Sequence, residues 1–216
     1  MSDQDVPCSE CAELLAKTRL ELDPHAFPES VSLYRFEPPF KQGLYRFKYG
    51  GEKRLGLVFG RQLAEQYKIM KPNADLITCV PRAKDGQRRM YNQSEVIARA
   101  MANQLRLPTD FHLLSKRNGA RSQVECPTKL ARQQNAQWAF RTGKSKTDLT
   151  GKRVVLVDDL YTTGATARAC SELLKQRGAA EVLVYTALRV VPLQPFTLQL
   201  NYERTVVEGN FSDKQR

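Results

Sequence analysis

Residues 154–188 constrain the fold more than any other part of the chain. They open with four consecutive apolar residues, 154–157, as is typical of a short strand buried on both faces of a parallel sheet. Apolar residues then recur at helical spacing over residues 166–177, Gly178 supplies the stop expected just past a helix, and a second apolar run covers residues 182–188. This order predicts a βαβ unit and hence an α/β fold built on a mostly parallel sheet.

An acid pair and a hydroxyl-rich turn lie between the first strand and the helix. Asp158 and Asp159 end the strand where open α/β sheets bind ligands, beside a helix N-terminus whose N–H groups and dipole attract anions. Two carboxylates repel a second phosphate but accept hydrogen bonds from a vicinal diol, so the pair is predicted to bind ribose and the turn its 5′-phosphate. The alternative is that the acids only end a strand and a threonine only caps the helix. The turn consists of Thr162, Thr163, Gly164, Ala165 and Thr166.

A basic loop follows another predicted strand, residues 76–80. Arginine binds phosphate oxygens in bidentate fashion and lysine adds a point charge, so such a loop can hold a diphosphate. For each cation taken singly, an ordinary solvated loop is the alternative. The predicted diphosphate loop contains Pro81, Arg82, Ala83, Lys84, Arg88 and Arg89.

Residues 154–166 resemble the phosphoribosyl pyrophosphate (PRPP) motif of the type I phosphoribosyltransferases, and within that superfamily the chain resembles the ComF family of competence proteins. The resemblance extends over about residues 40–190. It implies an α/β type I phosphoribosyltransferase fold, with a mostly parallel twisted sheet, helices on both faces and a small N-terminal hood. The supporting residues are Phe47, Lys48, Tyr49, Gly50, Gly51, Val80, Pro81, Tyr91, Asn92, Gln93, Gln123, Leu130, Arg132, Asn135, Ala139 and Phe140.

The resemblance also implies a flexible loop that closes over PRPP, here the polar and cationic stretch 115–123, after a strand expected at 111–114. Closure excludes water and brings cations to the diphosphate, whose negative charge grows as its bond to ribose C1 breaks. The predicted catalytic cations are Lys116, Arg117 and Arg121. Magnesium is expected on the diphosphate of PRPP, with Asp158 and Asp159 as further candidate ligands.

The sequence does not identify the acceptor of the phosphoribosyl group. In the resembled fold the acceptor pocket comes from the hood, here residues 30–70. Aromatic residues of this segment could stack on a nitrogenous acceptor, but membership of the core is the favoured interpretation. They are Tyr34, Phe36, Phe40, Phe47 and Tyr49.

Cys8 and Cys11 have the spacing of two ligands of one zinc ion, which requires four. Members of the resembled family often carry a four-cysteine N-terminal zinc module, but the second pair is missing here and only His25 is a nearby third ligand. A degenerate module without zinc is therefore favoured over a zinc site. The odd total of five cysteines fits reduced thiols, and Cys79 and Cys170 are expected in the core.

Length and charge fit one α/β domain with smaller appendages. We expect an N-terminal segment over 1–30, the phosphoribosyltransferase-like domain with its hood over 31–191, and a C-terminal strand or tail over 192–216. The net charge of +11 favours a polyanionic partner, either a pyrophosphorylated ligand or DNA, although solvated surface charge is the alternative. With no signal-like start and no apolar run of about 20 residues, a cytoplasmic protein without membrane insertion is expected.

Three functions remain open at this point. The first is a magnesium-dependent transfer of the phosphoribosyl group from PRPP to an unidentified nitrogenous acceptor. The second is a non-catalytic PRPP-binding module that serves DNA uptake with an ATPase partner or DNA, as the ComF resemblance implies. A zinc-dependent nucleic-acid protein is the weakest of the three, and a homodimer is compatible with all of them.

Overall fold

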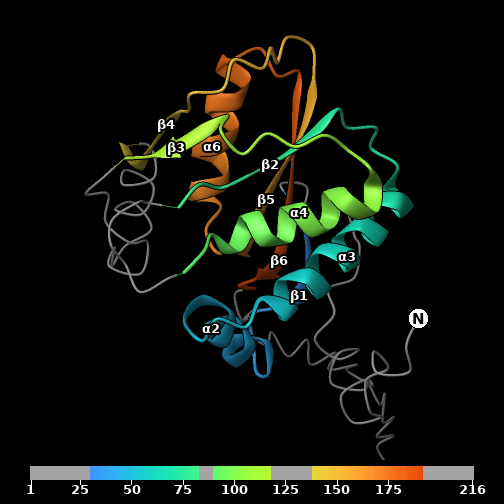
Figure 1. Ribbon diagram of the computed structural model, residues 1–216, viewed down its shortest axis with the longest axis vertical. Helices are drawn as coiled ribbons and strands as arrows, with labels where there is room; N and C mark the ends of the chain where they lie inside the picture. Colours follow the sequence, from blue (N-terminus) through green and yellow to red (C-terminus); the bar gives the residue numbers. More distant parts are fainter. Residues whose placement is uncertain (1–29, 83–89, 118–137, 192–216) are drawn as a thin grey trace, which may run out of the picture.

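A computed structural model describes residues 30–82, 90–117 and 138–191 and contains one four-stranded parallel sheet (Figure 1). Its strand order is β1-β6-β5-β2, and every neighbouring pair is parallel. The strands are β1 (Val31–Arg35), β2 (Leu76–Cys79), β5 (Arg153–Tyr161) and β6 (Glu181–Arg189). The predicted α/β fold with a mostly parallel sheet is confirmed.

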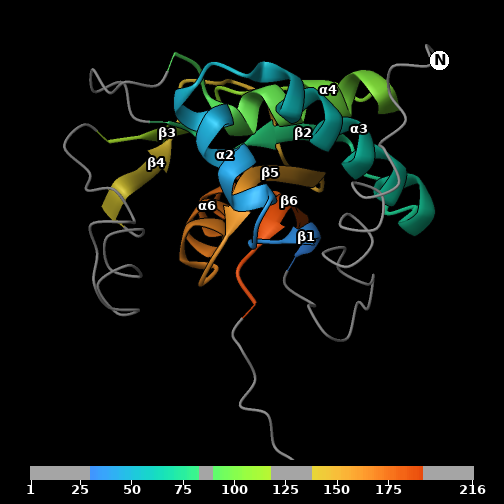
Figure 2. The same ribbon diagram turned by 90° about the horizontal axis from the view of Figure 1, so that it is seen from below.

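Helices cover both faces of this sheet, as Figure 2 shows from below. Three helices pack on one face, namely α2 (Phe40–Tyr49), α3 (Lys53–Met70) and α4 (Gln93–Leu105). The helix α6 (Ala165–Gln176) packs on the other. Alternate residues of β5 face the two layers, since Val155 and Val157 belong to one buried cluster while Val154 and Leu156 belong to the other.

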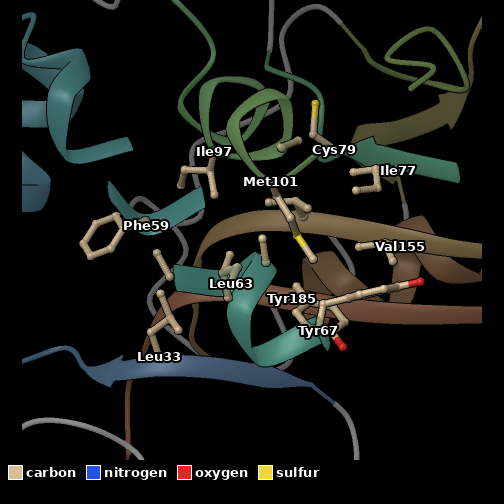
Figure 3. Close-up of a cluster of buried hydrophobic side chains, with 14 of the residues drawn as sticks. Leu33, Phe59, Leu63, Tyr67, Ile77, Cys79, Ile97, Met101, Val155 and Tyr185 are labelled. Atoms are coloured by element: carbon tan, nitrogen blue, oxygen red, sulfur yellow. The ribbon is translucent and has the colours of Figure 1, made fainter. Parts of the chain in front are cut away.

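The layer of α3 and α4 forms the larger buried cluster, shown in Figure 3. Phe59, Leu63 and Tyr67 recur every four residues along α3 and so point one apolar stripe at the sheet and at α4. Gly60 lies on the α4 side, where a Cβ atom would come within 2.5 Å of both the Ala100 Cβ and the Ile97 carbonyl oxygen. A glycine at this position therefore allows the two helices to approach closely.

A short antiparallel pair of strands lies beside α6 and is separate from the main sheet (Figure 1). It consists of β3 (Leu114–Lys116) and β4 (Phe140–Thr142). The strand predicted over 111–114 is thus wrong in its bounds. The reason is Asp110, whose carboxylate accepts a hydrogen bond from the backbone N–H of His112 at 2.8 Å and turns the chain there.

The segment in which a hood was expected joins the main sheet through β1 and its helical layer through α2 and α3. Tyr34 stacks on Phe40 at 4.2 Å between ring centroids, and both rings are buried with Phe47. Membership of the core is therefore confirmed for these three residues. Tyr49, in contrast, is 53% exposed.

Two smaller expectations can also be compared with the structure. Cys79 and Cys170 are buried, as predicted for core thiols. Across the described ranges, no helix combines the length and apolarity that crossing a bilayer requires. Of the predicted N-terminal segment, 1–30, only Ser30 is among the described residues, and the predicted C-terminal segment, 192–216, lies outside them.

Candidate functional site

The acid pair lies where β5 extends beyond its neighbour β2. The last paired residues are Cys79 and Val157, so Asp158 is the first residue of β5 past the end of β2. The sequence predicted that the acids end the strand, but β5 continues past them to Tyr161 because β6 continues to pair with it. Both acids are consequently held on an extended backbone instead of a loop.

Asp158 faces the N-terminal turn of α4 across this step in the sheet. Its Oδ1 accepts a hydrogen bond from the Ser94 hydroxyl at 2.9 Å and another from the backbone N–H of Asp159 at 2.9 Å. Burial raises the pKa of Asp158 to about 7, and the charge of Asp159 adds to this effect. The two hydrogen bonds and the charge of Lys48 oppose the shift without cancelling it.

Asp159 is paired with Lys48, which lies 111 residues earlier in the chain. The Lys48 Nζ lies 3.0 Å from its Oδ1 and 2.9 Å from its Oδ2, and both side chains are largely buried. Lys48 comes from the last turn of α2. This ion pair therefore ties α2 directly to the carboxyl end of β5.

Side-chain hydrogen bonds hold the backbone around Lys48. The Tyr91 hydroxyl donates to the Phe47 carbonyl oxygen at 2.6 Å, and Gln93 Nε2 lies 3.4 Å and 3.3 Å from the carbonyl oxygens of Phe47 and Lys48. Asn92 Nδ2 donates to the Val80 carbonyl oxygen at 3.0 Å, at the end of β2. Stretches that the sequence comparison singled out separately, 47–51, 80–81, 91–93 and 158–159, thus meet at one edge of the sheet.

The hydroxyl-rich turn leads into the N-terminus of α6. Gly164 has φ +74°, and a Cβ there would lie 2.3 Å from the Tyr161 hydroxyl and 2.8 Å from Arg168 Nη1. Arg168 Nη2 donates to the Thr163 carbonyl oxygen at 2.7 Å, so a side chain from the first turn of α6 holds the backbone of the turn. The N-cap residue, Gly164, has no side chain to cap α6, and the Ala165 N–H donates only a long hydrogen bond of 3.5 Å to Thr163 Oγ1, so an anion can compete for the first N–H groups.

The other predicted site residues are only partly within the described ranges. Pro81 and Arg82 follow β2 and lie at the same edge as the acid pair, whereas Ala83, Lys84, Arg88 and Arg89 lie outside the described residues. Lys116 ends β3 and Arg117 follows it, so both stand at the base of the segment that leads to Arg121, which is also outside. The weak zinc candidates are outside as well, namely Cys8, Cys11 and His25.

The acid pair does not fit a magnesium ion held by the protein. Both carboxylate oxygens of Asp159 already contact the Lys48 ammonium, and Oδ1 of Asp158 already accepts two hydrogen bonds. Within the described ranges, no group of three or more His, Cys, Asp or Glu side chains could hold a metal ion.

Sequence reasoning missed three residues of the site, Lys48, Ser94 and Arg168. Lys48 belongs to the stretch 47–51, which supported only the family resemblance. Ser94 directly follows 91–93, a second stretch of that kind. Neither could be assigned a role, because the ion pair spans 111 residues of sequence and the Ser94 hydrogen bond spans 64. Arg168 offered a local signal, since it lies one turn after the glycine it packs against.

Residues 91–191 match the family model described as the phosphoribosyl transferase domain. The match includes α4, β5, the hydroxyl-rich turn, α6 and β6, whereas α2, which carries Lys48, and β2 precede it. The fold and this match together show a phosphoribosyltransferase domain of the type I fold.

Comparison with curated proteins narrows this class. The chain is 25% identical over 192 residues to the DNA utilization protein YhgH of Salmonella typhi, covering 86% of this chain and 79% of that protein. It is 25% identical over 185 residues to the competence protein ComFC of Bacillus subtilis, with coverage of 84% and 72%. Competence protein F of Haemophilus influenzae is 32% identical over 102 residues, with coverage of 47% and 44%. The first two similarities extend over most of the chain, and all three agree with its resemblance to the ComF family.

Solved structures with a related fold include larger enzymes. The glutamine PRPP amidotransferase of B. subtilis matches with a TM-score of 0.41 and 25% identity, over 61% of this chain and 25% of that chain. The purine phosphoribosyltransferase of Pyrococcus horikoshii gives a TM-score of 0.39 and 20% identity, over 62% and 80%. This chain spans a quarter of the amidotransferase, and the reaction of that enzyme is not carried over to it.

Proposed function

We propose that this protein binds PRPP and transfers its phosphoribosyl group to a nitrogenous acceptor. The observation that carries the proposal is the juxtaposition of the acid pair on β5 with the N-terminus of α6, whose N-cap is Gly164, inside a phosphoribosyl transferase domain. Asp158 and Asp159 accept hydrogen bonds from the two ribose hydroxyls. The turn 162–166 binds the 5′-phosphate through backbone N–H groups and hydroxyls.

The remaining groups of the proposed site are cationic. Arg82, at the end of β2, and the basic residues that follow it bind the diphosphate, which carries its magnesium as part of the ligand. Lys116 and Arg117 stand where a closing segment would bring further positive charge to the diphosphate.

The proposed reaction breaks one bond and forms another at the same carbon. The bond from ribose C1 to the diphosphate oxygen breaks, the diphosphate leaves with its electron pair, and a nitrogen of the acceptor bonds to C1. The ribose carries positive charge between these events, and the protein contributes chiefly by orienting the reactants and stabilising the leaving group. The acid pair and the turn hold the ribose from its 2′, 3′ and 5′ sides during this step.

A calorimetric titration of magnesium–PRPP tests the binding. We expect saturable binding by the wild type and a loss of at least about tenfold in affinity for the Asp158→Asn, Asp159→Asn double variant, because each hydrogen bond to a charged group contributes roughly 1.5 to 3 kcal/mol. Glu172→Gln, on the exposed face of α6, is the matched control and should bind as the wild type does. Unchanged affinity in the double variant would refute the proposed site.

The names of the relatives favour a second candidate, a PRPP-binding module without turnover that acts in DNA uptake. YhgH is called a DNA utilization protein and ComFC a competence protein. The net charge of +11 is compatible with DNA as a partner. Release of pyrophosphate in the presence of nitrogen bases or amines would support the enzyme, whereas PRPP-dependent binding of DNA or of a competence ATPase without such release would support the module.

A further inference from the structure

We propose that Lys48 is the resident cation of the acid pair, which keeps divalent metal off the two carboxylates and reserves them for hydroxyl donors. Magnesium then enters the site only on the diphosphate of the ligand. The inference rests on the proposed function for the identity of that ligand, but not for the behaviour of the acid pair toward metal.

The first argument is the geometry of the ion pair. Nζ of Lys48 lies 3.0 Å and 2.9 Å from the two carboxylate oxygens of Asp159, so the ammonium lies between both oxygens instead of on one. A magnesium ion would bind the same oxygens at about 2.1 Å and would bring two positive charges against the ammonium. The two cations therefore exclude each other.

The second argument is that the lysine is held in place. The Lys48 side chain is 15% exposed and that of Asp159 12%, which distinguishes this pair from the exposed ion pairs of the protein. The carbonyl oxygens of Phe47 and Lys48 accept hydrogen bonds from Tyr91 and Gln93, and Gln93 is itself buried. These hydrogen bonds fix the backbone from which the Lys48 side chain reaches Asp159.

The third argument is the discrimination that this arrangement gives. A carboxylate oxygen has more than one lone pair, so an oxygen that contacts an ammonium can still accept a hydrogen bond from a neutral hydroxyl. A ribose diol is therefore compatible with Lys48 in place, whereas a second cation is not. Lys48 acts through Asp159 and is thus a positioning and specificity residue, with no contact to a reacting atom.

Manganese titration without PRPP, followed by the electron paramagnetic resonance signal of free Mn²⁺, tests the inference directly. We expect the wild type to show no Mn²⁺ site that depends on Asp159. Lys48→Met should gain one Mn²⁺ site, with an affinity at least about tenfold higher than any Asp159-dependent binding in the wild type. The Lys48→Met, Asp159→Asn double variant should lack that site. A lysine that only braced α2 would not produce a new metal site when removed.

Three variants serve as controls. Lys41→Met removes the same charge from an exposed position of the same helix and should gain no site. Lys48→Arg keeps the charge and should behave as the wild type does. Lys48→Gln replaces Lys48→Met if the apolar side chain prevents folding, which circular dichroism would show.

Several results would overturn the inference. One is a Mn²⁺ site in the wild type that Asp159→Asn abolishes. Another is a folded Lys48→Met or Lys48→Gln variant without a gained site, and a third is a gained site in Lys48→Arg. Failure of the wild type to bind magnesium–PRPP would refute the proposed function alone, because the Mn²⁺ titration contains no PRPP.

Discussion

The buried carboxylate of Asp158 lowers the free energy of unfolding when it is ionised. Its pKa is raised from an ordinary carboxyl value to about 7 by burial first and by Asp159 second. Between about pH 4 and pH 7 the native protein therefore binds more protons than the unfolded chain, so this group lowers the free energy of unfolding as the pH rises through that window. Destabilised groups of this kind are common in functional sites.

Asp158→Asn should accordingly stabilise the protein at pH 8 relative to the wild type, by on the order of 1 to 3 kcal/mol, and much less at pH 4.5. The asparagine Oδ1 can still accept the hydrogen bonds from Ser94 and from the N–H of Asp159, so packing is preserved. Thermal melts of both proteins at the two pH values measure the difference, with Glu172→Gln as control. An equal difference at pH 4.5 and pH 8 would contradict the assigned pKa direction.

At the scale of elements, the packing of α3 on α4 sets the position of the site, because α4 begins with Gln93 and Ser94, which bind the backbone at Lys48 and the carboxylate of Asp158. Gly60 permits the close approach of the two helices. Because β2 ends at Cys79 while β5 continues, Asp158 has no partner on β2 and instead accepts a hydrogen bond from Ser94 in the first turn of α4. A change in the packing of α3 on α4 should therefore shift Ser94 relative to Asp158.

Gly60→Ala tests this packing. We expect a loss of about 1 to 3 kcal/mol in the free energy of unfolding, because the new methyl group meets the Ala100 Cβ and the Ile97 carbonyl oxygen. Gly43→Ala in α2 is the matched control, since its methyl group meets only the flexible end of Leu55 and the change raises helix propensity by up to about 1 kcal/mol. Urea unfolding measures both, and equal effects would show that close packing at Gly60 is not the cause.

At the scale of the whole molecule, the parallel sheet and its helices could be read from the sequence because each depends on local patterning. The apolar run 154–157 predicted a strand buried on both faces. Gly178 predicted the end of the helix α6, and it has φ +98° in the structure. The turn at Asp110, which replaces the start of the strand predicted over 111–114, depends on two side chains 35 and 37 residues away, Ser145 and Thr147, that also bind its carboxylate. Such distant contacts have no signature in local spacing.

The candidate site divides in the same way. Its acid pair and turn are contiguous and were identified from sequence. Its counter-ion, Lys48, could not be found by spacing, since the ion pair joins residues 111 positions apart. The residues that were predicted but fall outside the described ranges, such as Arg88 and Arg121, remain predictions.

The edge position of β1 has a consequence for the synthesis of this protein. In the described sheet its partner is β6, with Val31 opposite Tyr185 and Arg35 opposite Arg189. During translation, β1 therefore cannot pair within this sheet until β6 has left the ribosome. Any messenger truncated before residue 181 would yield a nascent chain with an unpaired first strand and with Lys48 facing an unfinished site.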